Sequence, residues 1–339
     1  MKRLTKWERV EAALQGDEVD RIPISLWKHY HLQDRGPRQL ADVTVRLYRQ
    51  FDFDLIKLTP SGLTPIQDWG ATIQFGTDDD FLPQAVQPVI SSADQWPSLR
   101  RLEVKKGALG RELETIHHVA ADLKGEAPFV MTLFSPLSVA HKLCGDRVSG
   151  QRVVEHLRQS PRQLHLGLAI IADVVKEYAL ACLQAGASGI FFSTQLATYD
   201  VLTRKEYEEF GVPYDRRVLE GLAGKSQVTM LHICKRNIMF DLFADYPVHV
   251  INWADREGGP TLAEARKVTR KALAGGLGLD TLLNGSPADV QTQARDAIAQ
   301  TGGRGFILGP ACVVRGPSPD ANLAAARQVV EERDLARPV

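Results

Sequence analysis

His232, Cys234 and Cys312 are the residues whose types and spacing point most directly to chemistry. Residues two apart on an extended segment point the same way, so His232 and Cys234 can present an imidazole nitrogen and a thiol together. Cys312 follows a separate apolar run and can complete the set. One imidazole and two thiolates suit Zn²⁺, and three protein ligands with an open fourth position are typical of a catalytic zinc. The sequence therefore predicts a zinc ion that acidifies a bound thiol or water.

The same residues also have an interpretation without a metal. Free cysteines are often buried and behave as small hydrophobic side chains. His-x-Cys with a distant Cys is a short motif, and short motifs have many accidental matches. The position of both parts directly after apolar runs favours the metal. The other cysteines, Cys144 and Cys182, lie in helical patterns and are expected to pack in the core.

The elements that must position these residues alternate along the chain, with short apolar runs separated by helical patterns, as in parallel βα units. Continuously apolar runs are typical of strands that helices cover on the outside. The eight runs are Ile22–Leu26, Leu55–Leu58, Phe129–Leu133, Gly189–Phe192, Val228–Leu231, His249–Asn252, Leu273–Gly275 and Gly305–Leu308. We therefore predict an α/β fold, a (β/α)₈ TIM barrel that forms a single domain over residues 1–339. Active sites of such barrels lie at the carboxyl ends of the strands, where the fifth and eighth runs bring the three ligands together.

One irregular stretch, residues 61–127, interrupts this alternation. Apolar residues alternate over Trp69–Thr77, and Asp78–Asp80 follows as an acidic turn, which predicts a hairpin inserted after the second strand. This insertion is expected to cap the barrel mouth. Farther along, Pro287–Gln300 has a helical pattern, and Ser286 before the proline is the expected N-cap.

The charge balance narrows the class of partner. The chain has 41 basic and 41 acidic residues, so its formal net charge is zero. Proteins that bind nucleic acids or anionic membranes draw affinity from clustered positive charge, so we expect neither partner. No window approaches the roughly 18 apolar residues of a membrane helix, and the basic start lacks the apolar stretch of a secretory signal. We expect a cytoplasmic enzyme that acts on a small molecule.

Several stretches carry a likeness to a known family: Glu8–Gly16, Asp20–Pro23, Phe53–Lys57, Ala185–Ile190, Leu202–Phe210 with Pro213–Tyr214, His232–Cys234 and Gly305–Cys312. With these stretches the chain resembles the uroporphyrinogen decarboxylase superfamily along nearly its whole length. Within it, the chain is similar to the cobalamin-dependent methyltransferases that act on corrinoid proteins. The resemblance implies that the matching His, Cys and Cys bind zinc, whereas the decarboxylases lack these cysteines.

Two departures from the family pattern bear on the substrate. The decarboxylases have an Arg- and Gly-rich segment that grips porphyrinogen carboxylates, but this chain has Ser25–His31 at that place, which argues against porphyrinogen decarboxylation. The methyltransferases usually have Gly after the motif cysteine, and this chain has Lys235. A cation beside the metal leaves the second substrate open.

Six further residues are candidates for substrate binding: Trp27, Lys28, His29, His31, Asp54 and Asp255. The first four follow the first strand and are expected at the barrel mouth, where Lys28 would bind an anionic group such as a carboxylate. Solvated lysine and surface histidines are the alternative interpretation. Asp54 matches an acidic position of the family and is expected to face the barrel. Asp255 is a candidate for a fourth zinc ligand that a substrate displaces, or else a solvated loop acid.

The sequence thus predicts a zinc-dependent methyltransferase that exchanges a methyl group between a small substrate and cobalamin on a partner corrinoid protein. The substrate is either a thiol acceptor or a methoxylated or methylated donor, and both directions stay open. One alternative is a methionine-synthase-like homocysteine methyltransferase, and another is a non-catalytic zinc- or ligand-binding barrel. Related barrels often dimerise, so a homodimer is a possible assembly.

Overall fold

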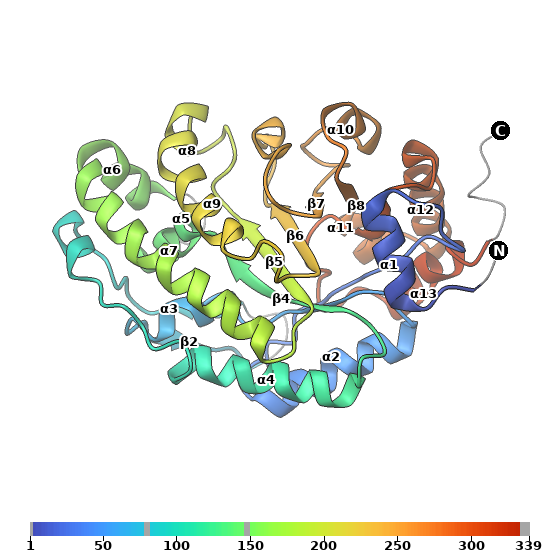
Figure 1. The fold of residues 1–339 in the computed structure, drawn as a ribbon, viewed down its shortest axis with the longest axis horizontal. Helices are drawn as coiled ribbons and strands as arrows, with labels where there is room; N and C mark the ends of the chain where they lie inside the picture. The colour runs from blue at the N-terminus through green and yellow to red at the C-terminus, as the bar shows by residue number, and fades with distance from the viewer. Residues whose placement is uncertain (1–2, 78–81, 146–149, 333–339) are drawn as a thin grey trace.

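A curled parallel sheet with helices on its outer side forms the centre of the computed structural model, which describes residues 3–77, 82–145 and 150–332 (Figure 1). Seven strands pair in the order β1-β4-β5-β6-β7-β8-β9. They are β1 Ile56–Leu58, β4 Phe129–Phe134, β5 Gly189–Thr194, β6 Val228–Ile233, β7 Val250–Trp253, β8 Ala272–Leu277 and β9 Phe306–Pro310. The predicted α/β barrel class is confirmed, and seven of the eight predicted runs are strands of this sheet.

The first predicted strand, Ile22–Leu26, is the exception. It lies between β9 and the chain before β1, where Ser25 N donates to Leu308 O and Asp54 N donates to Ile24 O. Only a single parallel bridge, Ile24 with Leu308, forms there. Pro23 has no amide hydrogen to donate, and Ile24 N donates to the carboxylate of Asp54 instead of to a strand. This segment closes the barrel without becoming a regular strand.

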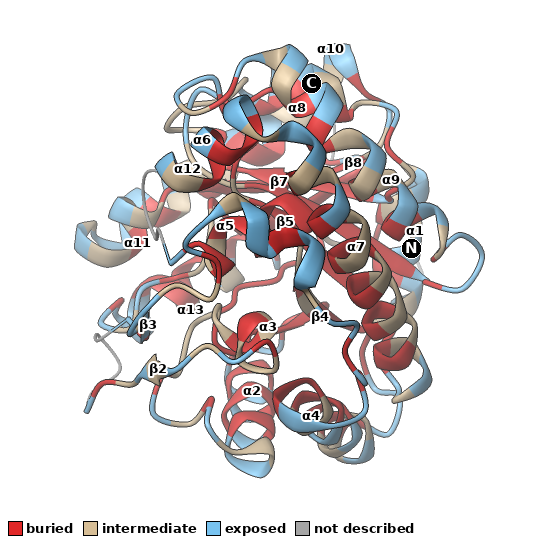
Figure 2. Cartoon of the chain, turned by 90° about the vertical axis from the view of Figure 1, so that its left-hand side faces the viewer, coloured by how far each residue is buried: buried red, intermediate tan, exposed pale blue. Residues whose placement is uncertain are grey.

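Helices cover the outside of the sheet and turn their buried faces towards it (Figure 2). Capping residues mark the beginnings of several helices. For example, α12 begins after Ser286, the predicted N-cap, whose hydroxyl accepts a hydrogen bond from Asp289 N. The helices are α1 Lys6–Gln15, α2 Pro37–Phe51, α3 Thr64–Gln67, α4 Gly107–Leu123, α5 Pro136–Leu143, α6 Gln151–Gln159, α7 Pro161–Gln184, α8 Arg204–Phe210, α9 Val212–Glu220, α10 Leu262–Val268, α11 Leu279–Asn284, α12 Pro287–Thr301 and α13 Asp320–Val329, with 3₁₀ turns η1 Ala93–Ser98 and η2 Phe240–Phe243.

The predicted insertion after the second run contains an antiparallel pair, β2 Ile73–Gln74 with β3 Gln84–Ala85. The acidic turn predicted at Asp78–Asp80 lies outside the described residues. The residues that follow it, Leu82–Ala85, reach the barrel mouth, where they line the cavity described below. Within the described part of the chain, every helix is too short or too polar to cross a membrane.

The register of the central strands places the predicted ligands. The sequence had placed His232 after the strand. In the structure β6 extends to Ile233, so His232 lies inside the strand. His232 pairs with Ser193 of β5 on one side and with Asn252 of β7 on the other. Cys234 follows the strand directly, and its amide donates to Thr194 O at 2.9 Å.

Candidate metal centre

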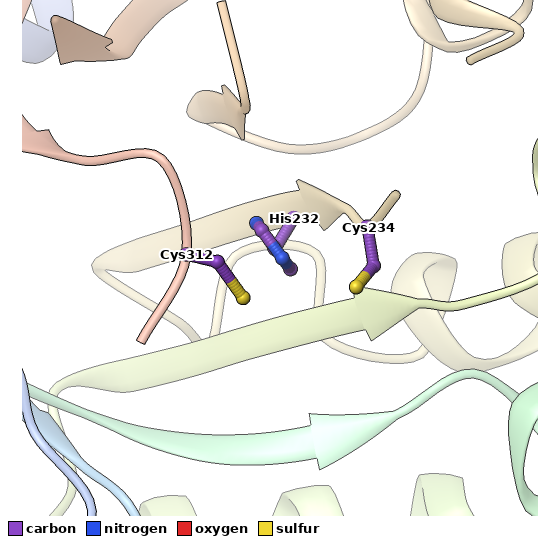
Figure 3. Close-up of side chains that lie close together, drawn as sticks. All are labelled: His232, Cys234 and Cys312. Atoms are coloured by element: carbon purple, nitrogen blue, oxygen red, sulfur yellow. The ribbon is translucent and has the colours of Figure 1, made fainter. Parts of the chain in front are cut away.

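The structure brings His232, Cys234 and Cys312 together, and one ligand atom from each lies within 4.8 Å of the others. Figure 3 shows the three side chains converging from the end of β6 and from the turn after β9. His232 is 3% exposed, and the two cysteines are half-buried. The structure therefore brings Cys312 to His232 and Cys234, as the sequence predicted.

The turn that carries Cys312 is held on two sides. Ala311 N donates to Leu277 O at 2.8 Å, and Val314 N donates to Trp27 O at 2.9 Å. These bonds tie the residues next to Cys312 to the end of β8 and to the segment that closes the barrel. The position of the thiol is therefore fixed by backbone contacts to both neighbouring elements.

Asn252 determines which nitrogen of His232 faces the thiols. Its Oδ1 lies 2.6 Å from His232 Nδ1. Its Nδ2 donates to Ala274 O and Pro310 O, so the amide oxygen must be the atom that faces the imidazole. His232 then carries its proton on Nδ1 and donates it to Asn252, which leaves Nε2 with a free lone pair.

This free Nε2 is the observation that tests whether the residues fit a metal. It is buried, and no protein group forms a hydrogen bond to it among the described residues. A buried nitrogen with a lone pair and no partner costs free energy unless something binds it. One imidazole nitrogen and two sulfurs within a few ångströms are donors that Zn²⁺ prefers, so the three residues fit a zinc ion.

The two thiols act as a pair. A hydrogen bond from Cys234 lowers the pKa of Cys312 well below its ordinary value. The same bond raises the pKa of Cys234, and burial adds to that shift. Of the two sulfurs, that of Cys312 is therefore the one that more readily becomes a thiolate.

Lys235 follows Cys234 in a left-handed backbone conformation, with φ of 78°. This conformation favours glycine, which is the residue that the resembled methyltransferases usually have there. The turn after Cys234 therefore has a backbone conformation that lysine does not favour.

Sequence reasoning did not identify Lys57 and Asn252. Lys57 lies on β1 inside the barrel, with Nζ 4.5 Å from the ring centre of Phe191, and Phe191 stacks on His232 at 5.4 Å. Burial lowers the pKa of Lys57 to about 7. A polar residue inside an otherwise apolar run was the signal in both cases. If the sequence had also shown which strand positions face the barrel interior, this signal would have placed both residues there.

His29 and His31 line a cavity of about 270 Å³ at the mouth, together with Leu82, Gln84, Phe134 and Lys142 among others. The two imidazoles stack with ring centres 4.8 Å apart. Burial and the charge of Lys57 lower the pKa of His29 well below its ordinary value, so this imidazole is neutral. Residues from the insertion line this cavity, whereas the three ligand side chains do not.

Trp27 and Lys28 lie in different surroundings. Trp27 is 2% exposed and meets Phe191 edge-on, with ring centres 5.5 Å apart, which places it inside the barrel. Lys28 is half-buried, and its Nζ contacts Ser318 O at 3.4 Å. Trp27 therefore packs against Phe191, the ring that stacks on His232, whereas Lys28 lies elsewhere.

The structure corrects the expected position of Asp54. This residue precedes β1 and so lies at the amino end of the strands, opposite the metal centre. Its carboxylate accepts from Arg9 Nη1 at 2.8 Å, from Arg21 Nη1 at 2.6 Å and from Ile24 N at 2.9 Å. Asp54 is buried and holds the closing segment in place, and it does not face the substrate site.

Asp255 lies outside the group of three candidate metal ligands. Its Oδ1 accepts a hydrogen bond from Gly276 N at 2.9 Å. Burial raises the pKa of this carboxyl, and the side chain is not a solvated loop acid. Asp255 ties the loop after β7 to the end of β8, next to the metal centre.

Comparisons with known proteins identify the family of the chain. The methylcobamide:CoM methyltransferase MtbA of Methanosarcina acetivorans is 22% identical over 346 residues, which cover 95% of this chain and 96% of that protein. A uroporphyrinogen decarboxylase of Aliivibrio fischeri is 28% identical over 190 residues, which cover 55% of this chain and 52% of that protein.

The solved structure of a methyltransferase from Methanosarcina mazei superposes with a TM-score of 0.82 at 22% identity, and the match covers 98% of each chain. This likeness supports the fold. A family model described as uroporphyrinogen decarboxylase (URO-D) matches residues 5–333. Because that match spans nearly the whole chain, the resemblance predicted from the sequence is confirmed, and the protein belongs to the URO-D family.

Proposed function

We propose that this protein is a corrinoid-dependent methyltransferase in which His232, Cys234 and Cys312 hold a zinc ion. The observation that carries the proposal is the buried Nε2 of His232, which has no hydrogen-bond partner among the residues that the structure describes and lies close to two thiols. The full-length match to a methylcobamide:CoM methyltransferase supports the class of reaction. The proposed substrates are a small thiol acceptor or a methylated donor, and cobalamin carried by a partner corrinoid protein.

Bound at these side chains, zinc would supply Lewis acidity, which acidifies a thiol or polarises a methylated donor atom. The protein residues orient the three ligands and shield the site from water. Asn252 keeps the Nδ1 proton of His232 in position, so Nε2 faces the two sulfurs. Before the metal binds, the hydrogen bond from Cys234 lowers the pKa of Cys312 and so favours the thiolate that zinc requires. Phe191 and Trp27 exclude water from one side of the site.

The same residues argue against porphyrin decarboxylation. The segment after Pro23, where the decarboxylases have arginines that bind carboxylates, carries the buried Trp27 and the neutral His29. The one lysine of this segment, Lys28, contacts a backbone oxygen. A substrate with many carboxylates therefore lacks its binding groups here.

The proposal is tested by measuring zinc content and methyl transfer together. Wild-type protein purified without chelator is expected to contain about one zinc per chain, and Cys312→Ser is expected to lose most of it. Cys182→Ala is the matched control, because Cys182 is buried in α7 away from the ligand group. Methyl transfer is then followed by the absorbance change of methylcobalamin, with candidate thiols as acceptors, and in reverse with reduced cobalamin and methoxylated donors.

Each result bears on a different part of the proposal. Zinc far below one equivalent in the wild type would count against the metal centre. Full zinc content with no methyl transfer in either direction would favour the non-catalytic zinc barrel. Transfer to homocysteine alone, from a folate donor and without cobalamin, would favour the methionine-synthase-like alternative.

A further inference from the structure

The cavity at the barrel mouth, called the mouth cavity below, has no role in the proposed chemistry of the candidate metal ligands. Its volume is about 270 Å³, and none of His232, Cys234 and Cys312 lines it. Pockets that hold a whole drug-sized ligand have volumes of about 300 to 1,000 Å³. The mouth cavity therefore fits either a very small molecule or one side chain of a larger molecule.

The walls of the mouth cavity are polar but almost entirely uncharged. Among the described residues that line it, Lys142 is the only lysine, arginine or acidic residue, and its ammonium group lies 4.1 Å from the ring centre of Phe134. Ser61, Gln84 and Gln195 contribute hydroxyl and amide groups, which can both donate and accept hydrogen bonds. Such walls suit a neutral polar group, because it forms hydrogen bonds without needing a counter-charge.

His29 adds a neutral imidazole to these walls. Burial lowers its pKa well below the ordinary value, and the charge of Lys57 contributes to this shift. Its Nδ1 is buried, and the described residues provide no hydrogen-bond partner for it. A neutral imidazole has one donor and one acceptor nitrogen, and a carboxamide likewise has N–H donors and a C=O acceptor. A carboxamide can therefore form a hydrogen bond with either tautomer of His29.

The end of β5 connects the wall of the mouth cavity with the metal centre. Gln195 follows Thr194, the last residue of β5, whose carbonyl accepts a hydrogen bond from Cys234 N at 2.9 Å. The backbone is fixed at this point, because Gln195 N donates to Ser138 Oγ at 2.8 Å. Neighbouring strands of a sheet lie about 4.8 Å apart. The cavity wall at Gln195 is therefore about one strand spacing from Cys234.

The segment that closes the barrel makes a second connection. His29 lies two residues after Trp27, whose carbonyl accepts a hydrogen bond from Val314 N at 2.9 Å. Val314 in turn lies two residues after Cys312. Both walls of the mouth cavity are therefore attached to segments that carry candidate ligands, although the ligands themselves do not line it.

The proposed reaction brings a molecule of suitable width to this face of the barrel. The cobalt of cobalamin must approach the reacting atom of the substrate at the metal centre, and the corrin ring then extends sideways over the neighbouring strand ends. Carboxamide side chains project from the edge of that ring. A small substrate inside the mouth cavity would not contact the candidate ligands, since none of them lines it, whereas a corrinoid is wide enough to reach both places.

We propose that the mouth cavity binds one carboxamide side chain of the corrin ring, through His29, Gln84 and Gln195, and so orients the ring over the metal centre. This inference rests on the proposed function, which brings cobalamin to this face, and it names the part of the corrinoid that the chain recognises. Leu82 also lines the cavity and is 51% exposed, so it offers an apolar contact to the edge of the ring.

The test measures the binding of free corrinoids to the purified, zinc-containing protein by titration calorimetry, without methyl transfer. Cobinamide keeps the side-chain amides and lacks the nucleotide of cobalamin. Its matched analogue is fully methyl-esterified cobyrinic acid, in which esters that cannot donate a hydrogen bond replace the amides. The wild type is expected to bind cobinamide about 3- to 10-fold more tightly than the ester, which corresponds to about one neutral hydrogen bond.

Variants assign this preference to the mouth cavity. His29→Phe keeps a ring that can stack on His31 and removes the nitrogens, and Gln195→Leu removes the amide. Each is expected to weaken cobinamide binding about 3- to 10-fold and to leave ester binding nearly unchanged. Ala85→Phe fills the cavity and should weaken the binding of both corrinoids. Gln184→Leu is the matched control, because this exposed glutamine ends α7 at the amino end of the strands, opposite the mouth.

Equal affinities of the wild type for cobinamide and the ester, or no binding of either, overturn the proposal. Unchanged cobinamide binding in His29→Phe, Gln195→Leu and Ala85→Phe does the same. If Ala85→Phe weakens the binding of small thiols or methoxylated donors and leaves corrinoid binding unchanged, the cavity holds the substrate instead.

The pair of ligands also tests the wild type by itself, so the proposal stays falsifiable if a variant does not fold. A preference for cobinamide without methyl transfer in either direction would refute the methyltransferase proposal and leave the corrinoid site standing. Methyl transfer without that preference would refute the corrinoid site and leave the methyltransferase proposal standing.

Discussion

His232 and Asn252 are register partners on β6 and β7, and their side chains meet inside the barrel, with Nδ1 of the imidazole 2.6 Å from Oδ1 of the amide. The amide has no freedom to turn, because its Nδ2 donates to Ala274 O within β8 and to Pro310 O at the end of β9. Four strands therefore cooperate to present one nitrogen lone pair to the two cysteines. A ligand held in this way binds a metal more tightly than a freely rotating one.

Replacement of Asn252 should weaken zinc binding without removing a ligand. In Asn252→Leu the imidazole loses the acceptor for its Nδ1 proton, so zinc affinity is expected to fall about 10- to 100-fold. Competition with a chromophoric chelator measures this affinity. Asn252→Asp keeps an acceptor at the same position and should lose less. Equal zinc affinities in the wild type and Asn252→Leu would show that Asn252 does not orient the ligand.

Removal of the metal should lower thermal stability. A ligand that binds only the folded state stabilises it by about 4 kcal/mol at a concentration a thousand times its Kd. Protein treated with chelator is therefore expected to melt several degrees lower, with recovery on addition of one equivalent of zinc. The Cys234→Ser/Cys312→Ser double variant should not respond to zinc. A zinc response of the same size in that variant would place the ion elsewhere.

The convergence of His232, Cys234 and Cys312 was predictable from the sequence because of a general property of parallel barrels. The carboxyl ends of the strands meet at one face, so the His232-x-Cys234 motif and Cys312, each following an apolar run, were expected to meet. Lys57 was hidden for the opposite reason. It lies within a short apolar run, and a single sequence does not say whether a given strand position faces the barrel or the helices.

Asp54 shows that the local sequence pattern does not reveal the tertiary partners of a residue. It adjoins the second run, and the sequence alone did not reveal that three separate donors engage it at the amino end of the strands. The closure of the barrel was equally hidden. Ile22–Leu26 has the composition of a strand. However, Pro23 has no amide hydrogen, and the amide of Ile24 donates to the side chain of Asp54, so neither amide can bond to a neighbouring strand.

Asp54 should therefore matter for stability and not for zinc. Asp54→Asn leaves the buried guanidinium of Arg9 and the partly buried one of Arg21 without their shared carboxylate, which is expected to cost about 3 kcal/mol of unfolding free energy. Asp52→Asn is the matched control, since Asp52 is exposed and its ion pairs with Lys6 and Arg327 should contribute at most about 1 kcal/mol. Urea unfolding and zinc content measure both effects. Loss of zinc in a stably folded Asp54→Asn protein would contradict the assignment.

Asp215 should give the protein a pH-dependent stability that is unrelated to the metal. This carboxyl is buried between Tyr207 and Tyr246, whose hydroxyls donate to its Oδ2 at 2.8 and 3.3 Å. Burial raises its pKa from 3.8 to about 7. In the folded state the group therefore keeps a proton that the unfolded state has already lost. Its contribution to stability is fully present below pH 3.8 and is lost as the pH rises through about 7.

Asp215→Asn isolates this contribution, because the amide keeps an acceptor for the two hydroxyls and does not ionise. Between pH 5 and pH 8 the wild type is expected to lose on the order of 2 kcal/mol of unfolding free energy relative to Asp215→Asn. Urea unfolding of both proteins at each pH, with saturating zinc, measures the difference and keeps metal binding constant. The sign is the decisive part: a wild type that gained stability over Asp215→Asn as the pH rose would mean that Asp215 is ionised in the folded protein, with a counter-charge that compensates its burial.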